Sequence, residues 1–178
     1  MTFRLHVRVA LPLLIGAAMA TPLSAQLDRG WTTAEAASKA GAVVAARVLG
    51  VQVREEVNIY TFVEFETVSV AKGSVPARFT YRMLGGRLGG VEVSGGEEAP
   101  TFRVGEEVVV FLGPETAPDG YPTLFWNQVY RVSSTAAGTK VVSPAATGLP
   151  ALAGRASASN PSSPTRLDDF LNAVKLVK

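Results

Sequence analysis

Paired carboxylates are the side chains in this sequence best suited to catalysis, because hydrolysis of a glycosidic bond uses two of them across a cleft. Glu64 and Glu66 project from the same face of a predicted strand, about 7 Å apart along it. That spacing suits a catalytic pair or a hard-cation site. A solvated strand face is the simpler interpretation, since such pairs are common on β-surfaces. Other acidic doublets are Glu55-Glu56, Glu97-Glu98 and Glu106-Glu107.

Arginine and aromatic side chains form a second group suited to binding. Arg78 and Arg82 lie on the polar side of a predicted strand, with Arg87 in the loop that follows, and together they could hold an anionic group. Cross-strand pairing with Glu64 and Glu66 is the simpler alternative.

A third group, residues 126–130, combines aromatic rings with amide donors and acceptors, as ligand faces of β-barrels do. The alternative is that Trp126 and Tyr130 share one strand face and fill the core. The candidate binding residues are therefore Arg82, Arg87, Trp126, Asn127, Gln128 and Tyr130. No catalytic residue is assigned.

Two residue types that carry much enzyme chemistry are almost missing from the sequence. There is no cysteine, and the single histidine is His6. The chain after the N-terminal segment therefore has no disulfide, no thiol nucleophile and no imidazole for a catalytic triad or a zinc site. We expect no cofactor and no structural transition metal, while a weakly held calcium at carboxylates stays open.

The N-terminus predicts a signal peptide over residues 1–25. Arg4 and Arg8 precede an apolar run, residues 9–20, that is too short to span a bilayer. We place cleavage after Ala25, with Ala20 as the second choice and an uncleaved anchor as the alternative. Loss of the two arginines lowers Lys plus Arg from 17 to 15, equal to Asp plus Glu. We therefore expect an exported protein, periplasmic or secreted, with no membrane span after cleavage and no attraction for nucleic acid.

The hydrophobic pattern predicts a mainly β domain over residues 26–142, after a short helix at residues 32–40 with a capping box of Thr32 and Glu35. Alternation predicts strands at residues 57–71 and 77–83. Apolar runs predict strands at residues 42–51 and 108–112, the latter a buried central strand, and residues 124–132 are the last predicted strand. A phase change near Val68 predicts a bulge. The glycine-rich residues 85–96 predict an inter-strand loop, with a short strand possible around 88–93, because a P-loop motif is missing.

The C-terminal region predicts a flexible linker over residues 143–164 and a helix over residues 165–178. Thr165 is the expected cap of this helix. An apolar stripe along it implies docking, since so short a helix is marginal alone; the stripe consists of Leu167, Phe170, Leu171 and Val174.

Strand and turn residues in the middle of the chain resemble those of exported bacterial small β-barrel proteins. The resembling segments are residues 43–48, Tyr60-Thr61 through Phe65 and Val68 to Lys72-Gly73, Gly85-Gly86, residues 105–112 and residues 128–132. In outline these proteins are similar to the netrin-like, OB-type domain of tissue metalloproteinase inhibitors. The inhibitors chelate zinc through an N-terminal cysteine, so the resemblance implies the fold but not the inhibition.

Taken together, the sequence predicts a small OB-like or netrin-like barrel with a short N-terminal helix and a docked C-terminal helix. We expect a non-enzymatic binding or interaction module for an unknown protein or envelope component. The alternatives are a carboxylate-based hydrolase of the cell envelope and an accessory protein that uses its C-terminal helix. Neither the ligand nor the oligomeric state follows from the sequence.

Cleavage after Ala25 predicts that the exported protein begins at Gln26. Mass spectrometry of the protein recovered from outside the cytoplasm measures this directly. Recovery of Met1, or of the intact apolar run in a membrane fraction, would contradict the assignment.

Overall fold

The computed structural model describes residues 31–96, 99–145 and 164–177. The predicted signal peptide, the doublet Glu97-Glu98 and most of the predicted linker lie outside these residues. The elements are α1 (Thr33–Lys39), β1 (Ala42–Glu55), β2 (Ile59–Lys72), β3 (Arg78–Leu84), β4 (Gly86–Leu88), β5 (Val91–Val93), β6 (Glu107–Thr116), β7 (Pro122–Leu124), the 3₁₀ helix η2 (Trp126–Gln128), β8 (Tyr130–Ser134), β9 (Lys140–Pro144), β10 (Thr165–Arg166) and α2 (Leu167–Lys175). The predicted mainly β fold with a helix near each end is confirmed.

Most of the strands form one curved antiparallel sheet in the order β10-β9-β8-β6-β1-β2-β3, with β7 paired to β6 off this path. Because every pairing is antiparallel, β3 and β7 run in the same direction, and they lie side by side. Among the described residues no backbone pairing joins them, so the sheet curls toward a barrel without closing into a ring.

The expected irregularity near Val68 lies in β2. Ala45 faces Ser69 and Ala46 faces Thr67, so the pairing with β1 passes over Val68. An extra residue of this kind bends a strand and increases its twist. The phase change in the sequence therefore marks the place where the long β1–β2 pair curls.

The sheet separates two apolar cores, and β1 and β6 contribute to both. Val108 and Val110 of β6 point into the curl of the sheet, with Phe65 and Tyr81. Their neighbours Val109 and Phe111 point to the opposite face, against the helices. All of these valines are fully buried. The apolar run predicted as a central strand is thus covered on both faces.

Helix α1 begins with the predicted capping box. The Glu35 N–H donates to Thr32 Oγ1 at 3.1 Å, and the Thr32 N–H donates to Glu35 Oε2 at 2.8 Å. At the other end Lys72 Nζ donates to the carbonyl of Ala37 at 2.6 Å, which satisfies a helix-terminal acceptor. The helix buries Ala36 and Ala37, whereas Trp31, before the helix, is 41% exposed.

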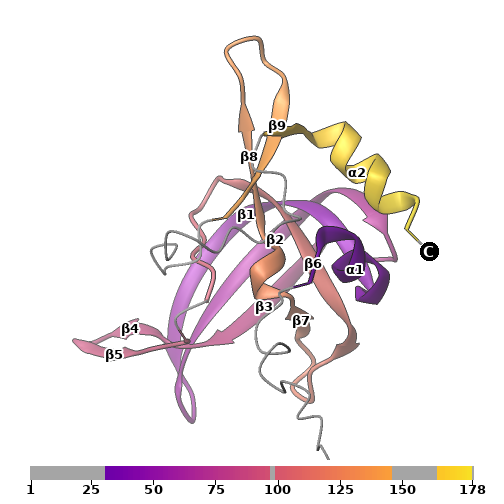
Figure 1. Cartoon of the computed structure of the whole chain (residues 1–178). Helices are drawn as coiled ribbons and strands as arrows, with labels where there is room; N and C mark the ends of the chain where they lie inside the picture. Colours follow the sequence, from indigo (N-terminus) through magenta and orange to yellow (C-terminus); the bar gives the residue numbers. More distant parts are fainter. Residues whose placement is uncertain (1–30, 97–98, 146–163, 178) are drawn as a thin grey trace, which may run out of the picture.

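Helix α2 docks on the outer face of the sheet through the predicted stripe, all four residues of which are buried. It lies beside α1 (Figure 1), and Phe170 packs against Phe111 and Tyr130. The predicted cap is wrong. Thr165 lies in β10, paired with Val142 of β9, and the N-cap residue Arg166 makes no side-chain capping bond. The added strand, which the sequence analysis did not predict, holds the start of the helix against the sheet.

Two other local predictions change in the structure. The predicted strand over residues 124–132 is broken by η2. The glycine-rich residues 85–96 form the β4–β5 hairpin, which projects from the sheet (Figure 1). Gly89 and Gly90 turn this hairpin with φ values of 58° and 86°, a conformation that glycine adopts without steric cost.

Docking of α2 predicts that Phe170→Ala lowers the free energy of unfolding by about 3–5 kcal/mol, because a buried phenylalanine is lost. Asn172→Ala, on the exposed side of the same helix, should change it by less than about 0.5 kcal/mol. Urea unfolding of both variants provides the measurement. Equal stability of the two variants would show that α2 does not pack on the sheet.

Candidate functional site

The free edge of β3 is the most distinctive surface feature of the sheet. The Gly85 N–H donates to the Ile59 carbonyl at 2.8 Å, and the Thr67 N–H donates to the Ala77 carbonyl at 2.9 Å. In an antiparallel pair, alternate residues bond to the same neighbour. Phe79 and Tyr81 therefore direct their backbone groups to β2, whereas Arg78, Thr80 and Arg82 direct theirs away from it. In the described part of the chain these outward groups have no backbone partner.

The free edge faces residues 113–126 across a gap that we call the seam. Tyr121, the residue before β7, lies between two cavities of the seam and lines both of them. The cavity at the start of β3 has a volume of about 510 Å³, and the cavity at its end about 270 Å³. The larger of them falls in the range of roughly 300–1,000 Å³ that ligand sites occupy.

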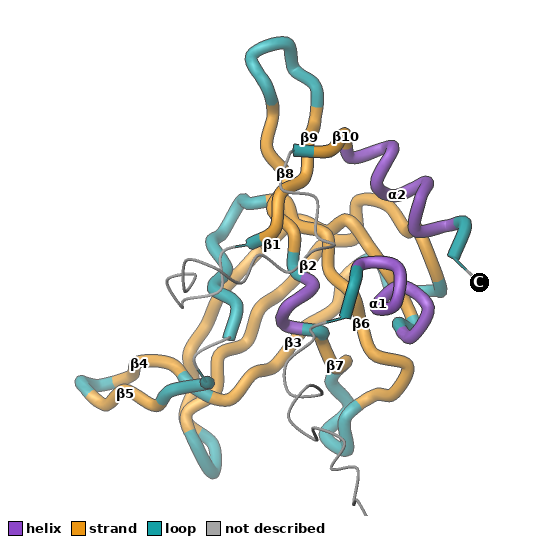
Figure 2. Tube along the Cα trace, in the orientation of Figure 1, coloured by secondary structure: helices purple, strands orange, loops and turns teal. Residues whose placement is uncertain are grey.

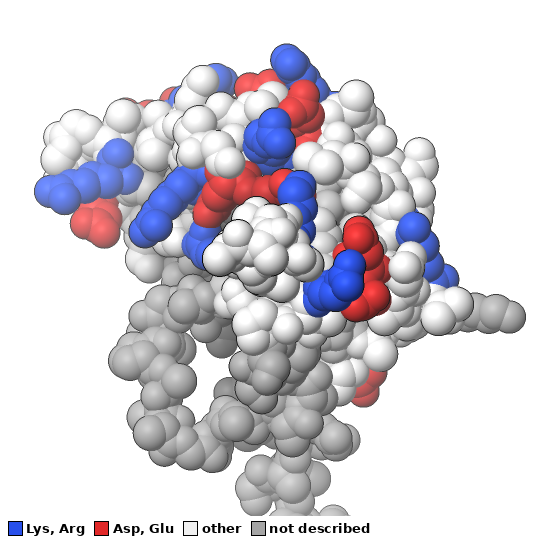
Figure 3. Space-filling view, turned by 90° about the horizontal axis from the view of Figure 1, so that it is seen from above, with Lys and Arg blue, Asp and Glu red and all other residues white. Residues whose placement is uncertain are grey.

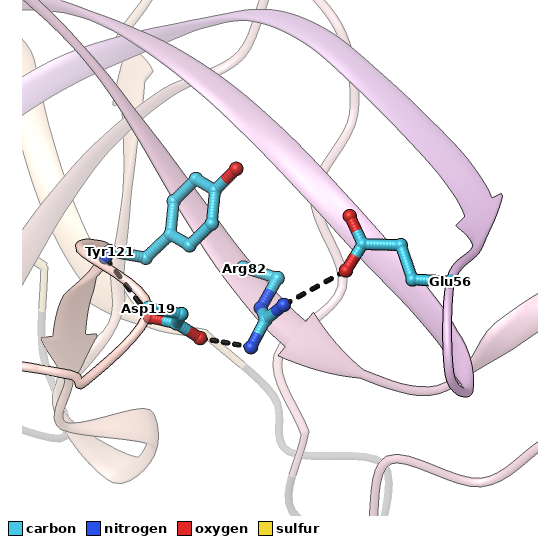
Figure 4. A network of polar contacts seen from close by, with 4 residues as sticks. All are labelled: Glu56, Arg82, Asp119 and Tyr121. Carbon is cyan, nitrogen blue, oxygen red and sulfur yellow. Dashed lines mark hydrogen bonds and ion pairs between the residues drawn. The ribbon is translucent and has the colours of Figure 1, made fainter.

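Arg82 bridges the seam on the outer face of the sheet (Figure 4). Its Nη1 donates to Glu56 Oε2 at 3.0 Å, and its Nη2 pairs with Asp119. The guanidinium lies 4.2 Å from the centre of the Tyr60 ring and 5.4 Å from that of Tyr121. Arg82 therefore ties the β1–β2 turn and the loop before β7 to β3. The two carboxylates outnumber the one cation, so this cluster does not favour a further anion.

Tyr81 and Trp126 bridge the seam on the inner side. The indole Nε1 of Trp126 donates to the Tyr81 hydroxyl. Tyr81 is buried, and burial raises its pKa to about 12, with the hydrogen bond from Trp126 acting in the opposite direction. The phenol is therefore neutral at physiological pH and serves as a fixed hydrogen-bonding group.

Of the predicted binding residues, Arg82 and Trp126 come together, since both line the smaller seam cavity. Asn127 is exposed on η2. Arg87 is exposed on the β4–β5 hairpin, opposite Glu92, and does not line the seam cavities. The structure therefore does not gather the three arginines around one anion site.

Gln128 and Tyr130 lie on the helix side of the sheet, away from the seam. Gln128 Nε2 donates to the Trp31 carbonyl at 2.9 Å, and the Tyr130 hydroxyl donates to Gln128 Oε1 at 2.9 Å. Burial also raises the pKa of Tyr130. Tyr130 fills the core, as the alternative interpretation had it, but Trp126 does not share its face, because η2 turns Trp126 to the opposite core.

The carboxylates find partners other than the expected ones. Glu66 lies opposite Arg78 in the register but is 4.0 Å from Arg47. Glu106 pairs with Arg131, and Glu107 with Lys140. Glu64 is exposed and borders a small cavity of about 130 Å³ that also contains Arg54. The predicted pairing of Arg82 with Glu64 or Glu66 is thus wrong, because Glu56 and Asp119 take that role.

Asp119 and Tyr121 are the site residues that sequence reasoning missed. They belong to the segment Pro118-Asp119-Gly120-Tyr121, a composition typical of a turn. The Tyr121 N–H donates to Asp119 Oδ1 at 3.1 Å, which shapes this turn and presents the carboxylate to Arg82. The sequence indicates the turn, but it does not indicate that Asp119 in this turn pairs with Arg82 on β3.

No protein-family model, curated protein or solved structure matches the chain. Within residues 31–96, 99–145 and 164–177, no three carboxylate or imidazole groups lie close enough to hold a metal ion. The helices of that same part of the chain are too short or too polar to cross a membrane.

Burial of Tyr81 predicts an alkaline loss of stability. Below pH 10 the phenol is protonated in both the folded and the unfolded state. Between about pH 10 and 12 only the unfolded chain releases the proton, so the free energy of unfolding falls by about 2–3 kcal/mol as pH rises. Tyr81→Phe should flatten this part of the profile in urea unfolding at successive pH values. An unchanged slope in the variant would contradict the assignment.

Proposed function

We propose that this protein is an exported, non-catalytic binding module that takes its ligand in the seam. The observation that carries the proposal is the unpaired edge of β3 facing two cavities, with Tyr121 between them and Arg82 and Trp126 lining the smaller one. Ligand sites combine a concave apolar lining with a few placed polar groups, and the seam has both.

The position of the seam agrees with the OB-type resemblance. Barrels of that type bind ligands on the face of their second and third strands, between two loops. Here β2 and β3 supply that face through Tyr60 and Arg82, while Glu56 and Asp119 come from the loops on either side. The resemblance therefore adds support to the proposed binding role of the seam.

Hydrolysis has less support than binding. Glu56 and Asp119 are both engaged by Arg82, which lies between them. The two carboxylates of a glycosidase instead face one another across the cleft that takes the substrate. A role for α2 as a partner helix also has less support, because its apolar stripe is buried on its own sheet.

Charge distribution supports a ligand other than nucleic acid. On the face drawn in Figure 3, acidic and basic side chains stand next to one another, and neither sign occupies a large area. Affinity for a phosphate backbone comes from several unopposed cations. That face therefore offers no extended run of cations to a nucleic acid.

Titration of the isotope-labelled mature protein with separate pools of random short peptides, oligosaccharides and nucleotides tests the proposal by amide chemical shifts. We expect one pool to shift the amides of Thr80, Arg82 and Gly120. Tyr121→Ala should weaken that binding about tenfold or more, because an aromatic wall is lost. The control Val104→Ala removes an exposed apolar side chain outside the seam and should leave the binding unchanged. Binding by no pool, or shifts confined to α1 and α2, would refute the proposal.

A further inference from the structure

We infer that the ligand of the seam is an extended peptide segment that adds to the free edge of β3 and places a carboxylate on Arg78. The inference rests on the proposed binding role of the seam and names its ligand class. It follows from three features of the larger cavity: a row of backbone groups, an opposite wall that cannot pair with them, and a single cation.

The backbone groups at the larger cavity come from Arg78 and Thr80, and Arg82 continues the row at the smaller cavity. Each presents an N–H and a C=O to the seam, at a spacing of about 7 Å for alternate residues of a strand. An unpaired row of this kind is a template for another strand, and proteins usually cover it or interrupt it with charge or proline. Arg78 and Thr80 line the 510 Å³ cavity, so the template opens into space rather than into packed side chains.

The opposite wall contains prolines at the points where a closing strand would need donors. Pro114 and Pro122 both line the larger cavity, and Pro122 is the first residue of β7. Proline has no N–H and cannot donate to a ladder. With β7 only three residues long, the described residues do not complete the pairing of β3. The edge is left for a segment that enters from outside.

Arg78 determines the charge of that segment. It is the one charged residue among those that line the larger cavity. In the described part of the chain it has no ion pair, in contrast to Arg82 with its two carboxylates. An acidic side chain or a C-terminal carboxylate of the peptide would complete a charge-assisted hydrogen bond there.

Peptide explains the site better than the other ligand classes do. Main-chain groups give affinity in strand addition, and pockets for alternate side chains give specificity. The cavities on either side of Tyr121 provide such pockets in sequence along β3. A nucleic acid would need several cations, and the larger cavity holds one.

The probe is a fluorescent library of random peptides of about seven residues, the length of β3, with one position held as glutamate. We expect binding to the mature protein, and about tenfold weaker binding when that position is glutamine or when the protein carries Arg78→Gln. Arg103→Gln, an exposed arginine outside the seam, should leave the affinity unchanged.

Proline at Thr80 tests strand addition itself. The Thr80 N–H points away from β2, so Thr80→Pro keeps the sheet and removes one donor from the edge. It should abolish binding, whereas Thr80→Val, which keeps the N–H, should retain it. Peptides methylated on alternate backbone nitrogens cannot donate to β3, so they test the same ladder of hydrogen bonds from the side of the ligand. This test uses the unmodified protein and does not depend on whether the proline variant folds. On binding, the Thr80 and Arg82 amides should gain protection from hydrogen exchange that Phe79 and Tyr81 already have.

The outcomes separate this inference from the proposed function. If an oligosaccharide shifts the seam amides and the peptide library does not bind, the proposed binding function stands and the inference of a peptide ligand is overturned. Equal affinity of methylated and unmethylated peptides would overturn strand addition. Equal affinity of the glutamate and glutamine libraries would overturn the role of Arg78.

Discussion

Two-sided burial of β1 and β6 is the constraint on which the rest of the structure depends. Successive residues of these strands point to opposite faces, yet Val43 and Val44, like Val109 and Val110, are fully buried. Each face therefore needs its own cover. The curl of the sheet covers one, and α1 and α2 cover the other. Since both helices serve as cover, neither face of β1 and β6 is open to solvent at these residues.

The seam is the consequence of a sheet that curls but does not close. Backbone pairing would seal β3 against β7, but proline at the start of β7 and the shortness of that strand prevent it. Side chains hold the two sides together instead, with Tyr81 and Trp126 inside and Arg82 and Asp119 outside. Because these bridges are made by side chains, the outward main-chain groups of β3 stay unpaired and space remains on either side of Tyr121. The two cavities occupy that space.

The arginines of the seam divide into two roles by their surroundings. Arg82 lies between two tyrosine rings and two carboxylates, so its charge is already used in holding loops to β3. Arg78 stands four residues earlier on the same strand and borders the larger cavity without an ion pair among the described residues. Both residues are arginines on the same face of β3. They differ because the loop before β7 brings the carboxylate of Asp119 to Arg82.

The sequence by itself determined the features that arise from neighbours along the chain. Alternation and apolar runs located most of the strands, the phase change at Val68 located the bulge, Thr32 and Glu35 located the helix start, and the α2 stripe predicted its docking. Only the tertiary structure decided what distant segments do to one another. Trp126 turns to Tyr81 while Gln128 turns to Trp31, and η2 breaks the predicted strand so that both can do so. Asp119 reaches Arg82 across 37 residues, and such a contact depends on how the whole sheet curls, which periodicity does not record.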